Sequence, residues 1–198
     1  MIEKILKYNQ LWSEVQKLSD KTYFRHLRDG QSPEYLWIGC SDSRVPAETL
    51  LGLQPGQLFV HRNVANIIKT DDDNSMSVLQ YAVDVLKVRH VIICGHSECG
   101  GIGAALDGGV NSYIQSWLQD VRQLALDCTD PIFIDAEKQQ KKEMLTEMNV
   151  KMQVRNLAKD DVILNAWKRG HNVAIHGWVF NIGQGRIKDL EVSVSGSL

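Results

Sequence analysis

The chain has 198 residues, with 22 Lys and Arg against 24 Asp and Glu and a formal net charge of −2. This length suits one domain with a full hydrophobic core, and the near-neutral charge gives no reason to expect a nucleic-acid or membrane surface. No apolar run could cross a bilayer, and the first ten residues lack the apolar core of a signal peptide. We therefore expect a cytoplasmic protein, organised as a single domain over residues 1–198, that binds neither nucleic acid nor membrane.

The first thirty residues predict a helical arm, residues 1–30. Apolar residues recur at helical spacing between residues 2 and 28, which indicates one or two amphipathic helices ended by GQSP (30–33). YLWIGC (35–40) is apolar throughout and too short for a helix, so it predicts a buried strand. After the turn QPGQ, LFVHRNVAN (58–66) predicts a second strand.

Further helices are predicted downstream of the second strand, from helical spacing of apolar residues or, in one case, from a charged segment. They cover residues 77–87, 100–106, 111–126, 135–148 and 149–169.

Three more segments predict strands: HVIICG (90–95), VAIHGWVF (173–180) and, after the turn GQG, a last strand near LEVSVS (190–195). Strands that alternate with helices are typical of an α/β domain. We therefore expect a mostly parallel central sheet flanked by helices.

Chemically reactive side chains close two of these strands. CSDSRVPA follows the first strand and places Cys40, Asp42 and Arg44 at alternate positions, and CGHSECGG closes the third with His96 and Cys99. The carboxyl ends of parallel strands line a common crevice, so these side chains are expected to meet. Two thiolates, an imidazole and a carboxylate suit a tetrahedral zinc ion, one per chain.

The predicted fourth ligand, Asp42, is the most easily displaced of the set, which favours a catalytic rather than a structural zinc site. Arg44 can withdraw the carboxylate from the metal through a charge-assisted pair. Once released, Asp42 can accept a hydrogen bond from zinc-bound hydroxide and orient it toward a substrate. Because two thiolates nearly cancel the charge of the metal, we expect activity to rise toward alkaline pH.

The motifs resemble a known family. CSDSRVPA and QYAVDVLKVRHVIICGHSECG (80–100) are similar to the two signature segments of the β-class carbonic anhydrases, including bacterial members with an aspartate-gated zinc. The likeness extends through HRNVAN (61–66) and HGWVF (176–180), so it covers most of the chain. The resemblance implies reversible hydration of carbon dioxide to bicarbonate and a proton. It also implies zinc held by residues 40, 96 and 99 and a catalytic dyad at residues 42 and 44.

The resemblance further implies a homodimer, often a dimer of dimers, whose N-terminal helices reach to a partner subunit. Tyr81 and Val85 would then line an apolar carbon dioxide channel, although both could equally be core residues. Some bacterial members hold a second, non-catalytic bicarbonate with residues that match Trp37, Arg62 and a tyrosine. Phe180 stands at the tyrosine position, so we expect weak bicarbonate inhibition.

Other interpretations remain open at this point. A non-catalytic, zinc-stabilised binding module would need the same ligands, and so would a hydrolase of carbonyl sulfide or carbon disulfide. The glycines of GGIGAA faintly resemble a dinucleotide-binding turn, but the full pattern is absent. Cys94 is interpreted as a core residue because Cys99 already completes the ligand set, and Cys128 has no evident partner.

Overall fold

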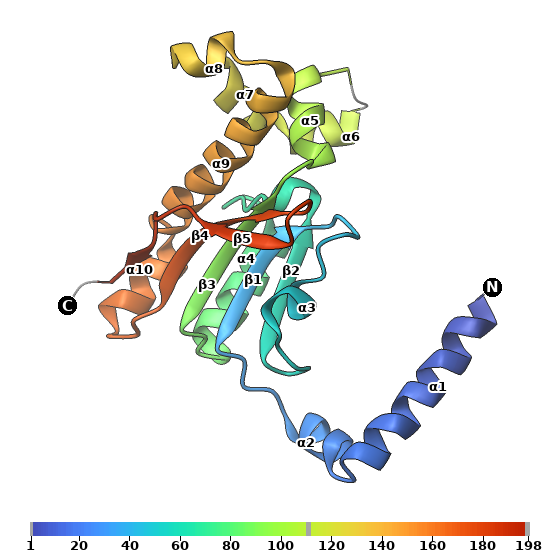
Figure 1. Ribbon diagram of the computed structural model, residues 1–198. Coiled ribbons are helices and arrows are strands. Elements are labelled where there is room, and N and C mark those ends of the chain that lie inside the picture. Colours follow the sequence, from blue (N-terminus) through green and yellow to red (C-terminus); the bar gives the residue numbers. More distant parts are fainter. Residues whose placement is uncertain (1, 110–111, 197–198) are drawn as a thin grey trace.

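The computed structural model describes residues 2–109 and 112–196, and a six-stranded sheet lies at its centre (Figure 1). The strands follow the order β2-β1-β3-β4-β5, and β6 pairs with β4. Their bounds are β1 (Tyr35–Cys40), β2 (Leu58–Asn63), β3 (His90–His96), β4 (Ala174–Asn181), β5 (Arg186–Asp189) and β6 (Val194–Ser195).

Strands β1 to β4 are parallel to one another, and β5 and β6 each run antiparallel to β4. This arrangement confirms the predicted α/β fold with a mostly parallel sheet flanked by helices. Parallel strands require crossover connections, and helices supply them between β2 and β3 and between β3 and β4.

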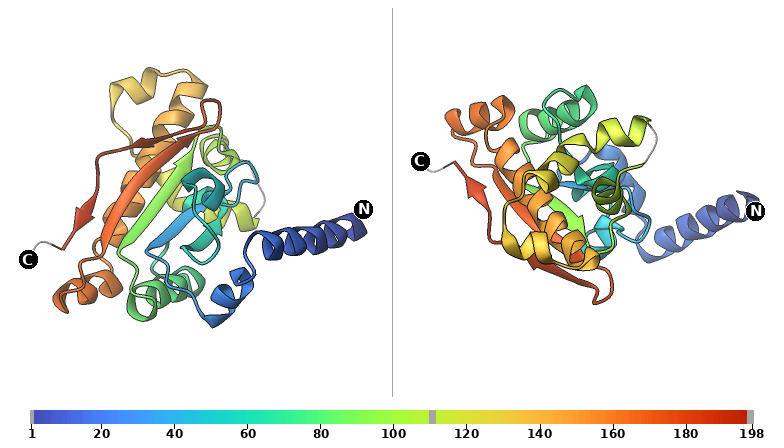
Figure 2. Two further views of the ribbon diagram at one scale, coloured as in Figure 1. Left: turned by 60° about the horizontal axis from the view of Figure 1, so that its bottom comes forward. Right: turned by 90° about the horizontal axis from the view of Figure 1, so that it is seen from above.

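The helices surround the sheet and extend beyond its carboxyl edge (Figures 1 and 2). The α-helices are α1 (Ile2–Ser19), α2 (Tyr23–Asp29), α3 (Ala47–Leu51), α4 (Asp73–Gln80), α5 (Gly100–Asp107), α6 (Ser112–Trp117), α7 (Gln119–Leu126), α8 (Pro131–Asp135), α9 (Lys138–Leu157) and α10 (Asp161–Lys168). A 3₁₀ turn, η1 (Val64–Asn66), follows β2, and a π-helical turn, η2 (Tyr81–Val85), extends α4.

The predicted helix boundary at residues 148 and 149 is wrong. Helix α9 runs through this point because Leu145, Val150 and Val154 keep one continuous buried face. The helix ends at Leu157 instead, and α10 begins after Asp160, whose carboxylate accepts a hydrogen bond from the Val162 N–H at 2.8 Å. A short polar side chain in this capping position starts a helix more decisively than a change in composition does.

Four other predicted elements differ in their bounds. The second strand stops at Asn63, because Ala65 (φ 64°) and Asn66 (φ 48°) adopt left-handed conformations that cannot continue a ladder. The helix expected over 77–87 begins at Asp73, and the last strand expected at 190–195 is the short pair β5 and β6. The helix expected over 111–126 is divided at Leu118, and its first residue lies outside the described residues. The short helices α3 and α8 had no counterpart in the sequence prediction.

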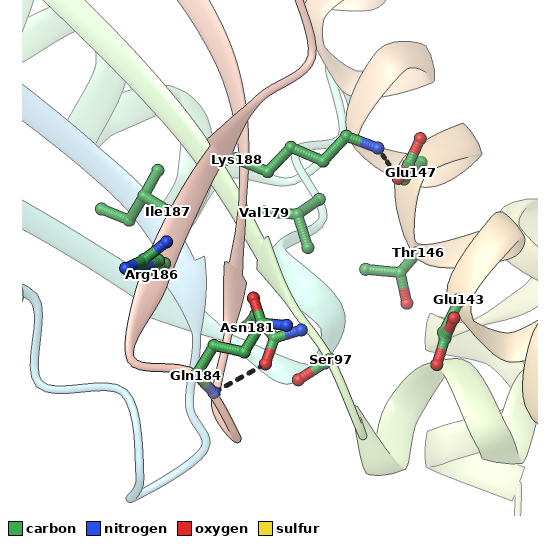
Figure 3. Close-up of a pocket in the computed structure, with 10 residues that line it drawn as sticks. All are labelled: Ser97, Glu143, Thr146, Glu147, Val179, Asn181, Gln184, Arg186, Ile187 and Lys188. Atoms are coloured by element: carbon green, nitrogen blue, oxygen red, sulfur yellow. Dashed lines mark hydrogen bonds and ion pairs between the residues drawn. The ribbon is translucent and has the colours of Figure 1, made fainter.

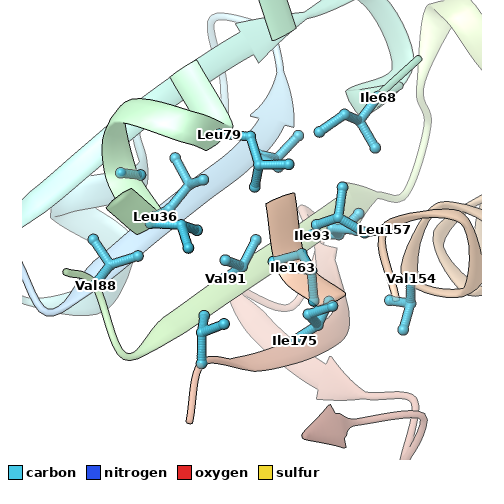
Figure 4. Close-up of a cluster of buried hydrophobic side chains, with 14 of the residues drawn as sticks. Leu36, Ile68, Leu79, Val88, Val91, Ile93, Val154, Leu157, Ile163 and Ile175 are labelled. Atoms are coloured by element: carbon cyan, nitrogen blue, oxygen red, sulfur yellow. The ribbon is translucent and has the colours of Figure 1, made fainter. Parts of the chain in front are cut away.

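The two faces of the sheet bury different clusters. Leu36, Val91, Ile93 and Ile175 point to one face, where α4, α9 and α10 cover them (Figure 4). Trp37 and its neighbours on the other face pack against α3 and the loop before it. Side chains of successive strand residues point to opposite faces, so burial on both sides explains the continuous apolar runs.

A third cluster lies at the carboxyl ends of the strands. It contains Cys40 and Cys99 together with buried residues of α5, α7, α8 and α9, among them Ile102, Val121 and Leu145. These helices enclose the end of the sheet at which the reactive side chains gather.

The N-terminal arm lies apart from the rest of the chain (Figures 1 and 2). Helix α1 contains no buried residue, and its apolar side chains, such as Leu11 and Val15, are exposed. Trp12 packs edge-on against Phe24, which joins α1 to α2. Among the described residues, no helix combines the length and the apolar character that a membrane span requires.

Candidate metal centre

Three predicted metal ligands meet at the carboxyl edge of the sheet. Cys40 is the last residue of β1, His96 is the last residue of β3, and Cys99 immediately precedes α5. Because β1 and β3 are parallel neighbours, both strands deliver their final residues to the same edge. The turn between His96 and Cys99 passes through Glu98, whose φ of 56° reverses the chain tightly enough to bring Cys99 back to the site.

The ligand atoms are close together and shielded from solvent. One ligand atom from each of Cys40, His96 and Cys99 lies within 4.8 Å of the others, and the two sulfur atoms are 3.9 Å apart. The residues are 5%, 0% and 1% exposed. Contact with the Cys99 thiol is the main cause that lowers the pKa of Cys40 to about 4, while the same contact raises the pKa of Cys99. The contact between the two sulfur atoms therefore favours one thiolate and one thiol in this pair.

His96 is held in the form that a metal needs. Its Nδ1 lies 2.8 Å from the Ser97 carbonyl oxygen, and because a carbonyl only accepts, Nδ1 carries the proton. Nε2 is therefore the unprotonated nitrogen, and it is buried without a hydrogen-bond partner. A buried, unpaired acceptor beside two thiols is costly unless something binds there. Two sulfur ligands and one imidazole nitrogen fit zinc, which prefers this donor set.

Asp42 and Arg44 form a bidentate ion pair beside these ligands. Arg44 donates from Nε to Asp42 Oδ1 at 2.9 Å and from Nη2 to Oδ2 at 2.7 Å. The side chain of Asp42 is 16% exposed, and its Oδ2 lies 3.8 Å from His96 Nε2. Hydrogen bonds from Arg44 hold the pKa of the Asp42 carboxyl well below its usual range. Asp42 is thus an ionised carboxylate within reach of the metal ligands.

Arg44 makes a further contact that the sequence analysis did not predict. Arg44 Nη2 also donates to the backbone carbonyl oxygen of Glu98 at 3.2 Å, which links the loop after β1 to the turn that carries Cys99. A backbone acceptor leaves no side-chain signature, so no residue pattern could have indicated this contact.

Cys94 lies outside the ligand group, as expected. It is fully buried in the hydrophobic cluster of Trp37, and burial raises the pKa of its thiol. Its sulfur lies 3.3 Å from the Gly95 carbonyl oxygen.

Tyr81 and Val85 lie in the π-helical turn η2, and both are substantially exposed in the single chain. The Tyr81 ring packs against Phe59 with ring centroids 5.8 Å apart. Phe59 precedes Asn63, the ladder partner of Cys40, by four residues, which corresponds to roughly 13 Å along a strand. Neither residue belongs to the buried cluster that contains Cys40 and Cys99, and their role in a channel stays a prediction.

The structure brings Trp37 and Phe180 together in one buried cluster, and the indole Nε1 of Trp37 is buried without a partner. Arg62 donates from Nε to the Cys40 carbonyl oxygen at 2.9 Å and from Nη2 to the Asp42 carbonyl oxygen at 2.5 Å. Arg62 therefore supports the backbone of the loop that carries Cys40 and Asp42.

A cavity of about 440 Å³ opens between β5 and α9 (Figure 3). Lys188 and Glu147 face each other across it as an ion pair with a 2.6 Å separation. Ser97 lines this cavity and is the residue next to His96, but the residues that line it include none of the metal ligands. The metal centre is thus a compact group of side chains separate from this cavity.

Comparison with known proteins agrees with this geometry. The model of the family described as carbonic anhydrase matches residues 35–187, which include all three ligands and the Asp42–Arg44 pair. The chain belongs to the carbonic anhydrase family, in its β class. Zinc enzymes that hydrate carbon dioxide make up this family, and the donor set described above is consistent with that chemistry.

Individual relatives cover nearly the whole chain. A carbonic anhydrase of Emericella nidulans is 42% identical over 199 residues, which span 99% of this chain and 86% of the relative. A β-carbonic anhydrase of Sordaria macrospora, described as tetrameric, has a TM-score of 0.92 at 37% identity and covers 98% of each chain. The Coccomyxa β-carbonic anhydrase in complex with acetazolamide has a TM-score of 0.93 at 35% identity, with 99% of this chain and 89% of that chain covered.

Proposed function

We propose that this protein catalyses the reversible hydration of carbon dioxide to bicarbonate and a proton, with one zinc ion bound by Cys40, His96 and Cys99. The observation that carries the proposal is the buried, unpartnered Nε2 of His96 beside two thiols, with a carboxylate 3.8 Å away. When bound, zinc lowers the pKa of a coordinated water and makes hydroxide available near neutral pH.

Asp42 and Arg44 are the proposed catalytic dyad. Both oxygens of Asp42 accept hydrogen bonds from Arg44, so the arginine holds the carboxylate away from the fourth metal position. Held by Arg44 in this way, Asp42 would accept a hydrogen bond from the hydroxide that zinc supplies and so orient a hydroxide lone pair toward the carbon of carbon dioxide. Without Arg44 the carboxylate itself is free to take the fourth position.

A stopped-flow assay with dissolved carbon dioxide, run beside a metal analysis, tests the proposal. We expect about one zinc per chain and rapid hydration. Bound zinc without hydration would instead indicate a zinc-stabilised binding module. Hydrolysis of carbonyl sulfide or carbon disulfide in preference to carbon dioxide hydration would assign the other chemistry to the same residues.

The pair Trp37 and Phe180 leads to a prediction about inhibition by bicarbonate. Replacing Phe180 with Tyr adds a hydroxyl donor to the buried cluster that contains the unpartnered indole of Trp37. One hydrogen bond to a charged group contributes roughly 1.5–3 kcal/mol, or about 10- to 100-fold in affinity. We expect Phe180→Tyr to be inhibited more tightly by bicarbonate than the wild type, in titrations at mildly acid pH. Strong inhibition of the wild type that does not change in the variant would contradict this.

The proposed enzyme is a homo-oligomer, built from dimers in which the arm of one chain packs on its partner. Six apolar residues of α1 are more than half exposed in the single chain, namely Ile2, Ile5, Leu6, Leu11, Val15 and Leu18. A helix that exposes this many apolar side chains indicates an interface. In the dimer, Tyr81 and Val85 would line the approach of carbon dioxide to the site. We propose further that the active site lies at this interface, so dissociation should also lower activity.

A single charge on α1 tests this assembly. Val15→Glu places a carboxylate on the apolar side of α1, so the variant should elute as a smaller species in size-exclusion chromatography with light scattering. Gln10→Glu is the matched control, because Gln10 lies on the polar side of the same helix and should leave the assembly unchanged. If both variants elute at the same volume as the wild type, the arm is not part of the interface.

A further inference from the structure

The segment that follows β2, residues 64–68, has an unusual backbone for its residue types. Ala65 (φ 64°) and Asn66 (φ 48°) are consecutive left-handed residues, and both are buried. Alanine has no local reason to adopt this conformation, because its Cβ crowds the following carbonyl there. Such a turn persists only where surrounding contacts hold it, and turns of this kind gather at functional sites.

Side chains from three elements hold this segment through its backbone groups. Trp117 Nε1 donates to the Val64 carbonyl oxygen at 2.8 Å. Asn63 both donates to the carbonyl oxygen of Ile67, at 2.6 Å, and accepts from its N–H, at 2.8 Å. The remaining contacts come from α9, the long helix that packs against one face of the sheet.

Asn149 and Gln153 lie one turn apart on α9. Their side-chain amides form a relay of hydrogen bonds with the segment of residues 64–68. Asn149 Nδ2 donates to the Ala65 carbonyl oxygen at 2.9 Å, and its Oδ1 accepts from Gln153 Nε2 at 3.0 Å. Gln153 Oε1 then accepts from the Ile68 N–H at 3.2 Å. The two side chains are 0% and 1% exposed, so these hydrogen bonds are made away from solvent. The relay thus spans the left-handed turn and fixes both of its ends.

The held segment lies directly against the two sulfur ligands. Cys40 pairs with Asn63 in the sheet, and Ala65 is buried in one cluster with Cys40 and Cys99. Gly101, two residues after Cys99, also lies close to the turn. A Cβ built on Gly101 would be only 3.0 Å from the Ala65 Cβ, so a glycine allows the chain after Cys99 to approach the turn this closely.

We propose that Asn149 and Gln153 are positioning residues of the metal centre, whose amides hold the Ala65–Asn66 turn against the Cys40 sulfur and the Cys99 loop. The inference rests on the proposed function in that it takes zinc to be the ligand of this site. Outer partners of metal ligands fix ligand orientation, and their loss costs about 10- to 100-fold in metal affinity or activity.

The test compares variants in the relay with a variant of equal burial outside it. Asn149→Leu removes the donor to Ala65 and keeps a side chain that branches at Cγ. Gln153→Glu keeps the acceptor for Ile68 but loses the donor to Asn149. Val154→Ala is the control. Val154 is buried on the same helix, but it belongs to the core cluster on the face of the sheet that α4, α9 and α10 cover. The substitution lowers stability through a cavity without touching residues 64–68 by any hydrogen bond.

Three readouts are measured on each full-length protein: zinc affinity by competition with a chelator, the sulfur-to-cobalt absorption band of the cobalt-substituted protein, and the melting temperature. We expect both relay variants to bind zinc roughly 10- to 100-fold more weakly and to shift the cobalt band. Val154→Ala should melt earlier than the wild type yet keep its affinity and band. If Asn149→Leu does not fold, Gln153→Glu carries the comparison with Val154→Ala.

The outcomes separate this inference from the proposed function. Wild-type affinity and an unshifted band in the relay variants, with a melting temperature lowered as in Val154→Ala, would overturn the positioning role and leave the proposed function standing. A wild-type protein that binds neither zinc nor cobalt would overturn the proposed function, and with it the inference.

Discussion

Alanine in place of Cys40, His96 or Cys99 should release the zinc and reduce carbon dioxide hydration to the background rate. Each residue contributes one of three ligand atoms that lie within 4.8 Å of one another. With one ligand lost, the fourth position cannot compensate, because Asp42 is already engaged by Arg44. Metal analysis of the purified variants and stopped-flow assays measure the two effects.

The matched control for this series is Cys94→Ala. Cys94 is a buried cysteine two residues before His96, but it packs in the hydrophobic cluster of Trp37 and is not part of the Cys40–His96–Cys99 group. Its replacement should leave zinc content and hydration close to wild type. Full zinc content in Cys99→Ala, or zinc loss in Cys94→Ala, would show that the ligands have been assigned wrongly.

The second large effect is expected in the dyad. Asp42→Asn and Arg44→Ala should both keep the zinc and lose about 10²-fold or more in turnover, as for other residues that orient or transfer a proton. Asparagine has no charge to pair with Arg44, and removal of Arg44 frees the carboxylate to occupy the fourth metal position. Arg44→Lys is the informative companion, because lysine keeps the charge but cannot make the bidentate contact.

The pH dependence of turnover in Asp42→Asn gives a second test of the dyad. Hydrogen bonds from Arg44 lower the pKa of Asp42, so the carboxylate stays ionised from about pH 6 to about pH 9. The pair contributes stability above the unfolded-state pKa, and that contribution is lost only as the pH falls through the folded-state pKa. Asp42→Asn should therefore lower turnover by a similar factor at every pH tested. A near-normal turnover rate in Asp42→Asn would indicate that Asp42 and Arg44 form only a structural ion pair.

The positions of the chemistry could be predicted from the sequence because they depend on local pattern. YLWIGC and HVIICG are short apolar runs that could only be buried strands, and the reactive residues follow each run directly. Parallel strands place their carboxyl ends at one edge, so Cys40 and His96 had to be neighbours once the fold class was known. The helix boundaries were less well predicted, because a single capping side chain such as Asp160 outweighs a change in composition.

The sequence by itself thus determined the fold class and the place of Cys40, His96 and Cys99 at the end of the sheet, since hydrophobic period and residue spacing act over a few neighbours. Only the tertiary structure decided how the site is held. The proton on His96 Nδ1 follows from the Ser97 carbonyl, and Arg44 reaches the Glu98 carbonyl. The left-handed turn at Ala65 accepts a hydrogen bond from Asn149, which lies 84 positions further along the chain. Backbone acceptors have no residue identity, and contacts between distant segments exist only after packing, so neither leaves a local pattern to read.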